Sequence, residues 1–294
     1  MANLQAQKPK FSMVIKSDVY QNLIKQTLGD PKKAERYTAA IMSAVATNPS
    51  LQQCEAKTIL SGSLLAESLG LAHSPQLGQY YLVPFKVKAK NGIPEHYDAT
   101  FILGYKGYLQ LAARSGNYKH INVTEIKEGE LVSYNPFDED IVLNPIQDVD
   151  EREKAETIGY YAMFEYVNGF KKVLYWSKAQ MLAHADRFSP AFSKVDYEKL
   201  QRGEIPQQDL RRYSSFWYKN FDEMAKKTML RQLISKWGVM STEMVQAVTL
   251  DNTATEILQG GIFDTIPESG FEATEIEQQE ELKEATEEVD FNAI

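Results

Sequence analysis

Hydrophobic and polar positions in the first third of the chain repeat with the period of an amphipathic helix. Asp30-Pro31 supplies an N-cap and a proline at the first helical position, and Asn48-Pro49 ends the pattern. A second helix is predicted over residues 55–69, with Gly70 as its stop. The apolar positions that define the two helices are Tyr37, Ile41, Met42, Val45, Ile59, Leu60, Leu64 and Leu65.

The middle of the chain changes to the pattern of β-strands. Residues 80–88 are rich in β-forming side chains, Asn91-Gly92 is typical of a hairpin turn, and residues 97–103 predict the returning strand. Pro84 cannot donate a ladder hydrogen bond, so it predicts that the first strand lies at an edge. A short helix ending at Gly116 follows this hairpin.

A second group of strands is predicted over residues 120–126 and 157–176, the latter as a hairpin that turns at Asn168-Gly169. Residues 134–156 between them are acidic and contain prolines, which predicts an irregular loop. Ser177 with Gln180 then forms a capping box that opens the next helix.

The last structured segment is predicted to be one long helix over residues 210–237. Leu230 and Ile234 interrupt its polar side, so that side is expected to be only partly solvated. Two rows at i+4 spacing lie on roughly opposite sides: an apolar row of Phe221, Ala225, Met229, Leu233 and Trp237, and a polar row of Lys219, Glu223, Lys227, Arg231 and Ser235.

Together these helices and β-hairpins predict an α+β fold. We expect an N-terminal arm over residues 1–29, a core over residues 30–263 and a disordered acidic C-terminal tail over residues 264–294. The single cysteine, Cys54, excludes a disulfide within the chain. No signal-peptide run and no membrane-spanning run is present, so we expect a cytoplasmic protein that does not contact membrane.

Charge is distributed unevenly along the chain. The formal net charge is −8, but residues 264–294 hold eleven acidic residues and one lysine, which leaves residues 1–263 with 29 acids and 31 bases. An overall acidic balance would argue against a nucleic-acid partner, whereas a mildly basic body with an acidic tail does not. The tail could dock a partner, screen a basic groove or serve solubility alone.

The strongest candidate for a functional segment is residues 211–237, which contain seven basic residues and only two acidic ones, Asp222 and Glu223. Lysine and arginine bind phosphates, and flat side chains stack on unpaired bases. A solvated amphipathic helix whose aromatic residues belong to the core is the alternative. The bases are Arg211, Arg212, Lys219, Lys226, Lys227, Arg231 and Lys236, and the aromatic residues are Tyr213, Phe216, Trp217, Tyr218, Phe221 and Trp237.

Two further segments are candidates for phosphate contacts. Lys86, Lys88 and Lys90 share one face of the predicted hairpin, either as a basic finger along DNA or as edge lysines that block aggregation. Residues 104–108, Gly-Tyr-Lys-Gly-Tyr, place glycines at a strand-to-helix junction, where backbone N–H groups approach a phosphate. The chain contains no GxxxxGK[ST] or GxGxxG motif, so nucleotide hydrolysis is not expected.

One enzymatic alternative remains. Asp98 on one predicted strand and Glu125 with Lys127 on another could hold Mg²⁺ and activate water, as in metal-dependent nucleases. The four histidines lie far apart in sequence, and none has zinc-ligand spacing with Cys54.

Two motifs resemble those of the RecT-type phage single-strand annealing proteins. Residues 101–116, FILGYKGYLQLAARSG, are similar to the central motif of that family, and residues 222–233, DEMAKKTMLRQL, are similar to its basic helix. The sequence Leu82-Val83-Pro84-Phe85 and the helical pair before Gly70 also fit, so the resemblance covers roughly residues 30–250.

The resemblance implies an annealing protein that is not an enzyme. Members pair complementary single strands without ATP, bind the annealed duplex, form rings or helical filaments, and work beside a 5′→3′ exonuclease and a host single-strand-binding protein. It further implies a fold similar to the eukaryotic strand-annealing fold, in which a small twisted antiparallel β-sheet with hairpins packs on several helices. The other implications are action in a bacterial host cell and no required cofactor, with Mg²⁺ as an aid to DNA binding. The predicted DNA-binding residues are Tyr105, Lys106, Tyr108, Arg211, Lys219, Lys226, Lys227 and Arg231, with Lys86 and Lys88 added from spacing alone.

Overall fold

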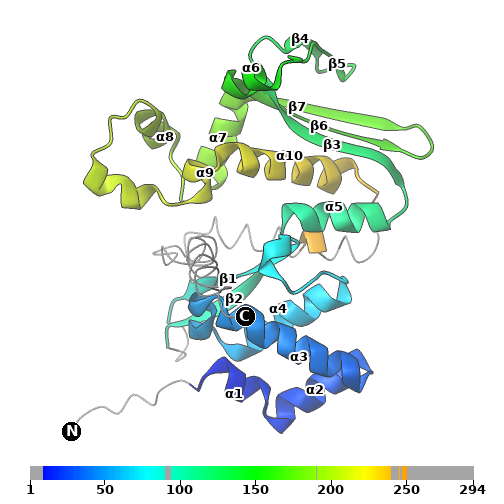
Figure 1. The fold of residues 1–294 in the computed structure, drawn as a ribbon, viewed down its shortest axis with the longest axis vertical. Coiled ribbons are helices and arrows are strands. Elements are labelled where there is room, and N and C mark those ends of the chain that lie inside the picture. Colours follow the sequence, from blue (N-terminus) through cyan, green and yellow to red (C-terminus); the bar gives the residue numbers. More distant parts are fainter. Residues whose placement is uncertain (1–8, 90–93, 190, 240–244, 246, 250–294) are drawn as a thin grey trace, which may run out of the picture. The chain divides into compact units, whose positions relative to one another are not determined.

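The computed structural model describes residues 9–89, 94–189, 191–239, 245 and 247–249, and it divides into two compact units at Ile102 and Leu103 (Figure 1). The fold is α+β with small antiparallel sheets packed on helices, as predicted. No helix among the described residues is both long and apolar enough to cross a bilayer. Asn91-Gly92 and the tail over residues 264–294 lie outside the described residues.

The first unit consists of helices that pack on a two-stranded sheet, β1–β2. Asp30 caps α3 by accepting a hydrogen bond from the Lys32 N–H, and Gly70 adopts a positive φ just after α4, so both predicted helices are confirmed. Residues 9–29 of the predicted arm form α1 and α2, whose apolar side chains join the core of α3 and α4. The elements are α1 Phe11–Ile15, α2 Asp18–Leu28, α3 Pro31–Ala46, η1 Pro49–Gln53, α4 Ala56–Ser68, η2 Pro75–Leu77, β1 Tyr80–Val87 and β2 His96–Leu103.

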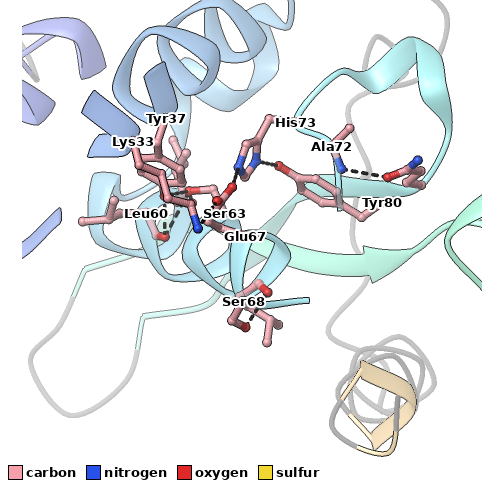
Figure 2. Close-up of polar contacts among 12 residues, drawn as sticks. Lys33, Tyr37, Leu60, Ser63, Glu67, Ser68, Ala72, His73 and Tyr80 are labelled. Carbon is pink, nitrogen blue, oxygen red and sulfur yellow. Dashed lines mark hydrogen bonds and ion pairs between the residues drawn. The ribbon is translucent and has the colours of Figure 1, made fainter. Parts of the chain in front are cut away.

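A chain of polar contacts holds the segment between α4 and β1 in this unit (Figure 2). The buried His73 ring contacts the Tyr80 hydroxyl at 2.6 Å through Nδ1 and the Glu67 carboxylate at 2.8 Å through Nε2. Glu67 also pairs with Lys33 of α3 at 2.9 Å. Burial lowers the pKa of His73 and outweighs the opposing effect of Glu67, so the ring is neutral near pH 7. Its hydrogen bonds link α4 to β1, and the Lys33–Glu67 ion pair links α3 to α4.

The second unit is built on the antiparallel sheet β3–β6–β7 (Figure 1). The Asn168-Gly169 turn and the Ser177–Gln180 capping box are both confirmed, the turn with Gly169 at φ 88°. The elements are α5 Tyr105–Arg114, β3 Tyr118–Lys127, β4 Leu131–Asn135, β5 Asp140–Leu143, α6 Val149–Lys154, β6 Thr157–Tyr166, β7 Lys171–Ser177, α7 Lys178–Phe188, α8 Lys194–Gln201, η3 Gln207–Tyr213, α9 Phe216–Lys219 and α10 Phe221–Trp237.

Alternate residues of β6 pack into two hydrophobic cores, one on each side of this sheet. Tyr160, Ala162 and Phe164 face the helices and pack with α7 and with the apolar row of α10. Tyr161 and Met163 face the other side, where the β4–β5 hairpin packs against them. The sheet therefore fixes α7 and α10 on one face.

Two sequence predictions are wrong. Residues 134–156 are not an irregular loop: the end of β4, β5 and α6 lie there, because Ile141 and Leu143 pack on the sheet and Asp148 caps α6 by accepting from the Glu151 N–H at 2.9 Å. Residues 210–237 are not one continuous helix. The chain breaks after η3 and again at Asn220, where φ is −132° and ψ is 57°.

Candidate nucleic-acid interface

Helix α10 buries two of its sides and leaves one stripe partly open. Phe221, Ala225, Met229 and Leu233 pack on the sheet, and Leu230 and Ile234, which interrupt the polar side, are also buried. The polar side is therefore only partly solvated, as predicted. Trp237, at the end of the apolar row, is exposed instead.

Lys227 and Arg231 lie one turn apart on the open stripe of α10, where both side chains are partly exposed. Like charges at i,i+4 destabilise a helix by about 0.2–0.5 kcal/mol. The two residues lie only about 6 Å apart along the helix axis, so one polyanion can bind both cations and relieve this repulsion. The stripe is therefore suited to neighbouring phosphates of one strand.

Helix α7 adds His184 and Arg187 beside this stripe. Burial, and then the positive charges of Arg231 and Lys236, lower the pKa of His184 to about 4. The His184 ring lies 4.6 Å from the Phe188 ring, and the Arg187 guanidinium lies 5.2 Å from that same ring. Arg231 and Lys236 of α10 therefore lie within electrostatic reach of His184, whose ring contacts Phe188 on α7.

Strand β7 contributes Lys172 at the far end of α10. Its Nζ lies 4.3 Å from the centre of the exposed Trp237 ring, and the Lys236 Nζ lies 5.8 Å from it. Lys172 also forms an ion pair with Glu139. We call the set formed by α7, β7 and α10 the basic face; it consists of Lys172, Arg187, Lys227, Arg231 and Lys236.

Two carboxylates balance the charge of Lys226 on α10. Its Nζ lies 2.5 Å from Glu223 and 3.5 Å from Glu125 of β3. Burial alone would lower the pKa of Lys226, but these carboxylates outweigh burial and raise it. Phosphates would have to compete with Glu125 and Glu223 for this lysine.

The other predicted DNA-binding residues are spread over both units. Lys86 and Lys88 belong to the first unit, and Lys86 is paired with Glu95 at 2.8 Å. Lys106, Lys219 and Arg211 are exposed on α5, α9 and η3 of the second unit.

The two tyrosines of the central motif differ in exposure. The half-buried Tyr105 lies within electrostatic reach of Lys226, and burial raises the pKa of its hydroxyl. The prediction for Tyr108 needs correction, since its side chain is 0% exposed and offers no ring face to a base.

Most aromatic residues of the basic segment belong to the core. Trp217, Tyr218 and Phe221 are buried in the cluster under α10, and Tyr213 packs against it. The alternative interpretation, that these rings stabilise the fold, therefore holds for them. Trp237 is the ring of this segment that combines exposure with neighbouring cations.

The residues of the nuclease alternative do not converge within one unit. Asp98 lies on β2 of the first unit, whereas Glu125 and Lys127 lie on β3 of the second. Glu125 is paired with Lys226, and the Lys127 Nζ donates to the Thr157 hydroxyl at 3.0 Å. Within the described ranges, no three His, Cys, Asp or Glu side chains are grouped to hold a metal ion.

Sequence comparison identifies the family. The profile of the RecT family matches residues 35–263, a span that contains both motif segments and the whole basic face. The chain belongs to the RecT family. It is 37% identical over 225 residues to the uncharacterized protein YqaK of Bacillus subtilis (strain 168), a match that covers 76% of this chain and 66% of YqaK. It is 26% identical over 224 residues to Protein RecT of Escherichia coli (strain K12), covering 74% of this chain and 71% of that protein.

The chain spans slightly less than two thirds of the length of YqaK. Lys172 and Arg187 belong to the basic face without any sequence signal, because β7 and α7 are distant from α10 in the sequence and pack with it only in the folded chain.

Acid is expected to destabilise the second unit through His184. The unfolded chain binds this proton near pH 6.5, whereas the folded pKa is about 4, so the free energy of unfolding falls as the pH drops from 6.5 to 4 and levels off below that range. Urea unfolding of the wild type and His184→Gln across this range measures the effect. The variant should lose less stability on acidification, and equal losses would exclude this role of His184.

Proposed function

We propose that this RecT-family chain anneals complementary single-stranded DNA without ATP and without breaking or forming covalent bonds. The observation that carries the proposal is the basic face, where α10 presents Lys227 and Arg231 in line, next to Lys236, Lys172 and Arg187. Cations arranged in a row suit a phosphate backbone, since each one that neutralises a phosphate releases counterions.

The mechanism needs positioning rather than a catalytic residue. The basic face holds one strand by its phosphates, which leaves the edges of the bases open to a complementary strand. Each base-pair step that forms is favourable by about 1.4 kcal/mol, so pairing proceeds without nucleotide hydrolysis. Specificity for sequence resides in the bases, and the protein binds all sequences alike.

We further propose that copies of the chain assemble into a ring or helical filament that extends the face along the strand and holds the nascent duplex. Binding along a strand is then cooperative. The expected partners are a 5′→3′ exonuclease that exposes the strands and a host single-strand-binding protein. The proposed place of action is the bacterial cytoplasm, with Mg²⁺ as an aid to DNA binding rather than a required cofactor.

The test follows two complementary end-labelled oligonucleotides, mixed with the protein in Mg²⁺ buffer without nucleotide. Native and denaturing gels of the same samples separate pairing from strand cleavage. Faster pairing of strands that stay full-length supports annealing. Shortened strands would instead favour the nuclease alternative of Asp98, Glu125 and Lys127, and Glu125→Gln would then be expected to abolish the shortening.

A further inference from the structure

The β4–β5 hairpin presents apolar side chains to solvent on the face that does not contact the sheet. Phe137 at its turn is 93% exposed, and Val132 and Val142 on its strands are also exposed. Single exposed apolar residues are ordinary, but three on one hairpin form a patch that gains free energy when covered.

The hairpin is held in place, so this patch is preformed. At its base, the buried Glu130 accepts from the Arg152 Nε at 2.7 Å and from the Lys127 N–H at 2.8 Å. In the turn, the Phe137 N–H donates to the Asn135 side chain at 3.0 Å, and Glu139 pairs with Lys172. The hairpin would therefore lose little conformational entropy when a partner binds this patch.

The charge around the hairpin indicates which kind of partner surface is complementary to it. Residues 128–156 hold ten acidic residues and two bases, whereas residues 1–127 and 157–263 together hold 19 acidic residues and 29 bases. This segment repels DNA, and it also repels the acidic tail over residues 264–294. A basic protein surface with exposed apolar side chains is complementary to it.

Helices α1 and α2 of the same chain carry such a surface. Met13 is 68% exposed and Val19 is 77% exposed, and Leu23 lies one turn from Val19 on the same side of α2. Three exposed lysines accompany one exposed acid, Asp18, on this segment: Lys10, Lys16 and Lys25.

We propose that the β4–β5 hairpin of one copy docks on the α1–α2 surface of a second copy. Because the two surfaces differ, the contact is head-to-tail, and each added copy leaves one hairpin and one α1–α2 surface open for the next. The inference rests on the oligomer of the proposed function and names the two surfaces that build it.

Charge reversal in the full-length chain tests the pairing of these surfaces. One variant carries Asp138→Lys with Asp140→Lys, and the other carries Lys16→Glu with Lys25→Glu. Sedimentation velocity at 0.1 M salt should show assembly of the wild type, loss of assembly for each variant alone, and recovery when the two variants are mixed. Recovery follows because the basic hairpin of one variant then meets the acidic helices of the other.

Phe137→Ser provides a second measurement. It should raise the protein concentration needed for assembly by roughly 10- to 100-fold. Phe170→Ser, which removes an exposed ring from the β6–β7 turn, is the matched control and should assemble like the wild type. A wild type that stays monomeric, variants that assemble normally, or a mixture that fails to recover would each overturn the proposal. If the wild type assembles but does not anneal DNA, the proposed function is refuted and this interface is not. If the wild type anneals DNA and Phe137→Ser leaves assembly unchanged, this interface is refuted and the proposed function is not.

Discussion

Removing three cations of α10, with Lys227→Ala, Arg231→Ala and Lys236→Ala in one chain, is expected to weaken single-strand DNA binding by about 100-fold at 0.1 M salt. Each phosphate contact on a single strand contributes about 0.7 to the slope of log affinity against log salt, so three contacts contribute about two units. The loss should be equal for oligonucleotides of any sequence, since phosphates carry no sequence information.

The matched control removes three exposed lysines elsewhere, with Lys32→Ala, Lys154→Ala and Lys199→Ala. Both triple variants have the same net charge, so fluorescence anisotropy across a salt series separates local contacts from overall charge. The control should keep a slope close to that of the wild type. Equal slopes for both variants, or losses that depend on sequence, would refute the basic face as the phosphate site.

Asp222→Ala is expected to lower the free energy of unfolding by about 1–3 kcal/mol. The Asp222 carboxylate of α10 accepts a hydrogen bond from the Tyr160 hydroxyl at 2.6 Å and another from the Thr157 hydroxyl at 3.3 Å, both on β6. The Tyr160 side chain is fully buried, so its hydroxyl loses its partner with no water to replace it.

A double-mutant cycle with Tyr160→Phe measures this contact by urea unfolding. Removing both partners should cost less than the sum of the single losses, because no unpaired hydroxyl remains. The salt slope of DNA binding should stay that of the wild type, since Asp222 positions α10 and does not contact phosphate. Additive losses would show that the hydrogen bond does not tie α10 to the sheet.

Segments with strong periodicity could be predicted from the sequence, together with their ends. The Asp30-Pro31 start of α3, the Gly70 stop and the Ser177–Gln180 capping box depend on local chemistry and are confirmed. The β4–β5 hairpin could not be predicted, because its inward side chains become recognisable only once the sheet they pack against is known. The break before α9 depends on tertiary contacts as well, since the Ser215 hydroxyl donates to the Ala191 carbonyl at 3.0 Å.

The candidate site was only partly predictable for a related reason. Helical spacing placed Lys227 and Arg231 in one row of a single element, and the resemblance to the RecT-type family predicted them as DNA contacts. Nothing local indicates that Lys226 is paired with carboxylates or that Tyr108 is buried. Lys172 and Arg187 come to the basic face from β7 and α7, which only the packing of the sheet brings to α10.

The most direct test of the central claim is the rate at which two complementary labelled strands pair in stopped flow, with the protein present and nucleotide absent. The wild type should accelerate pairing well above the spontaneous rate, the Lys227/Arg231/Lys236 alanine variant should lose most of that acceleration, and rising salt should suppress it. A pairing rate that the wild type leaves unchanged at every salt concentration would contradict the account.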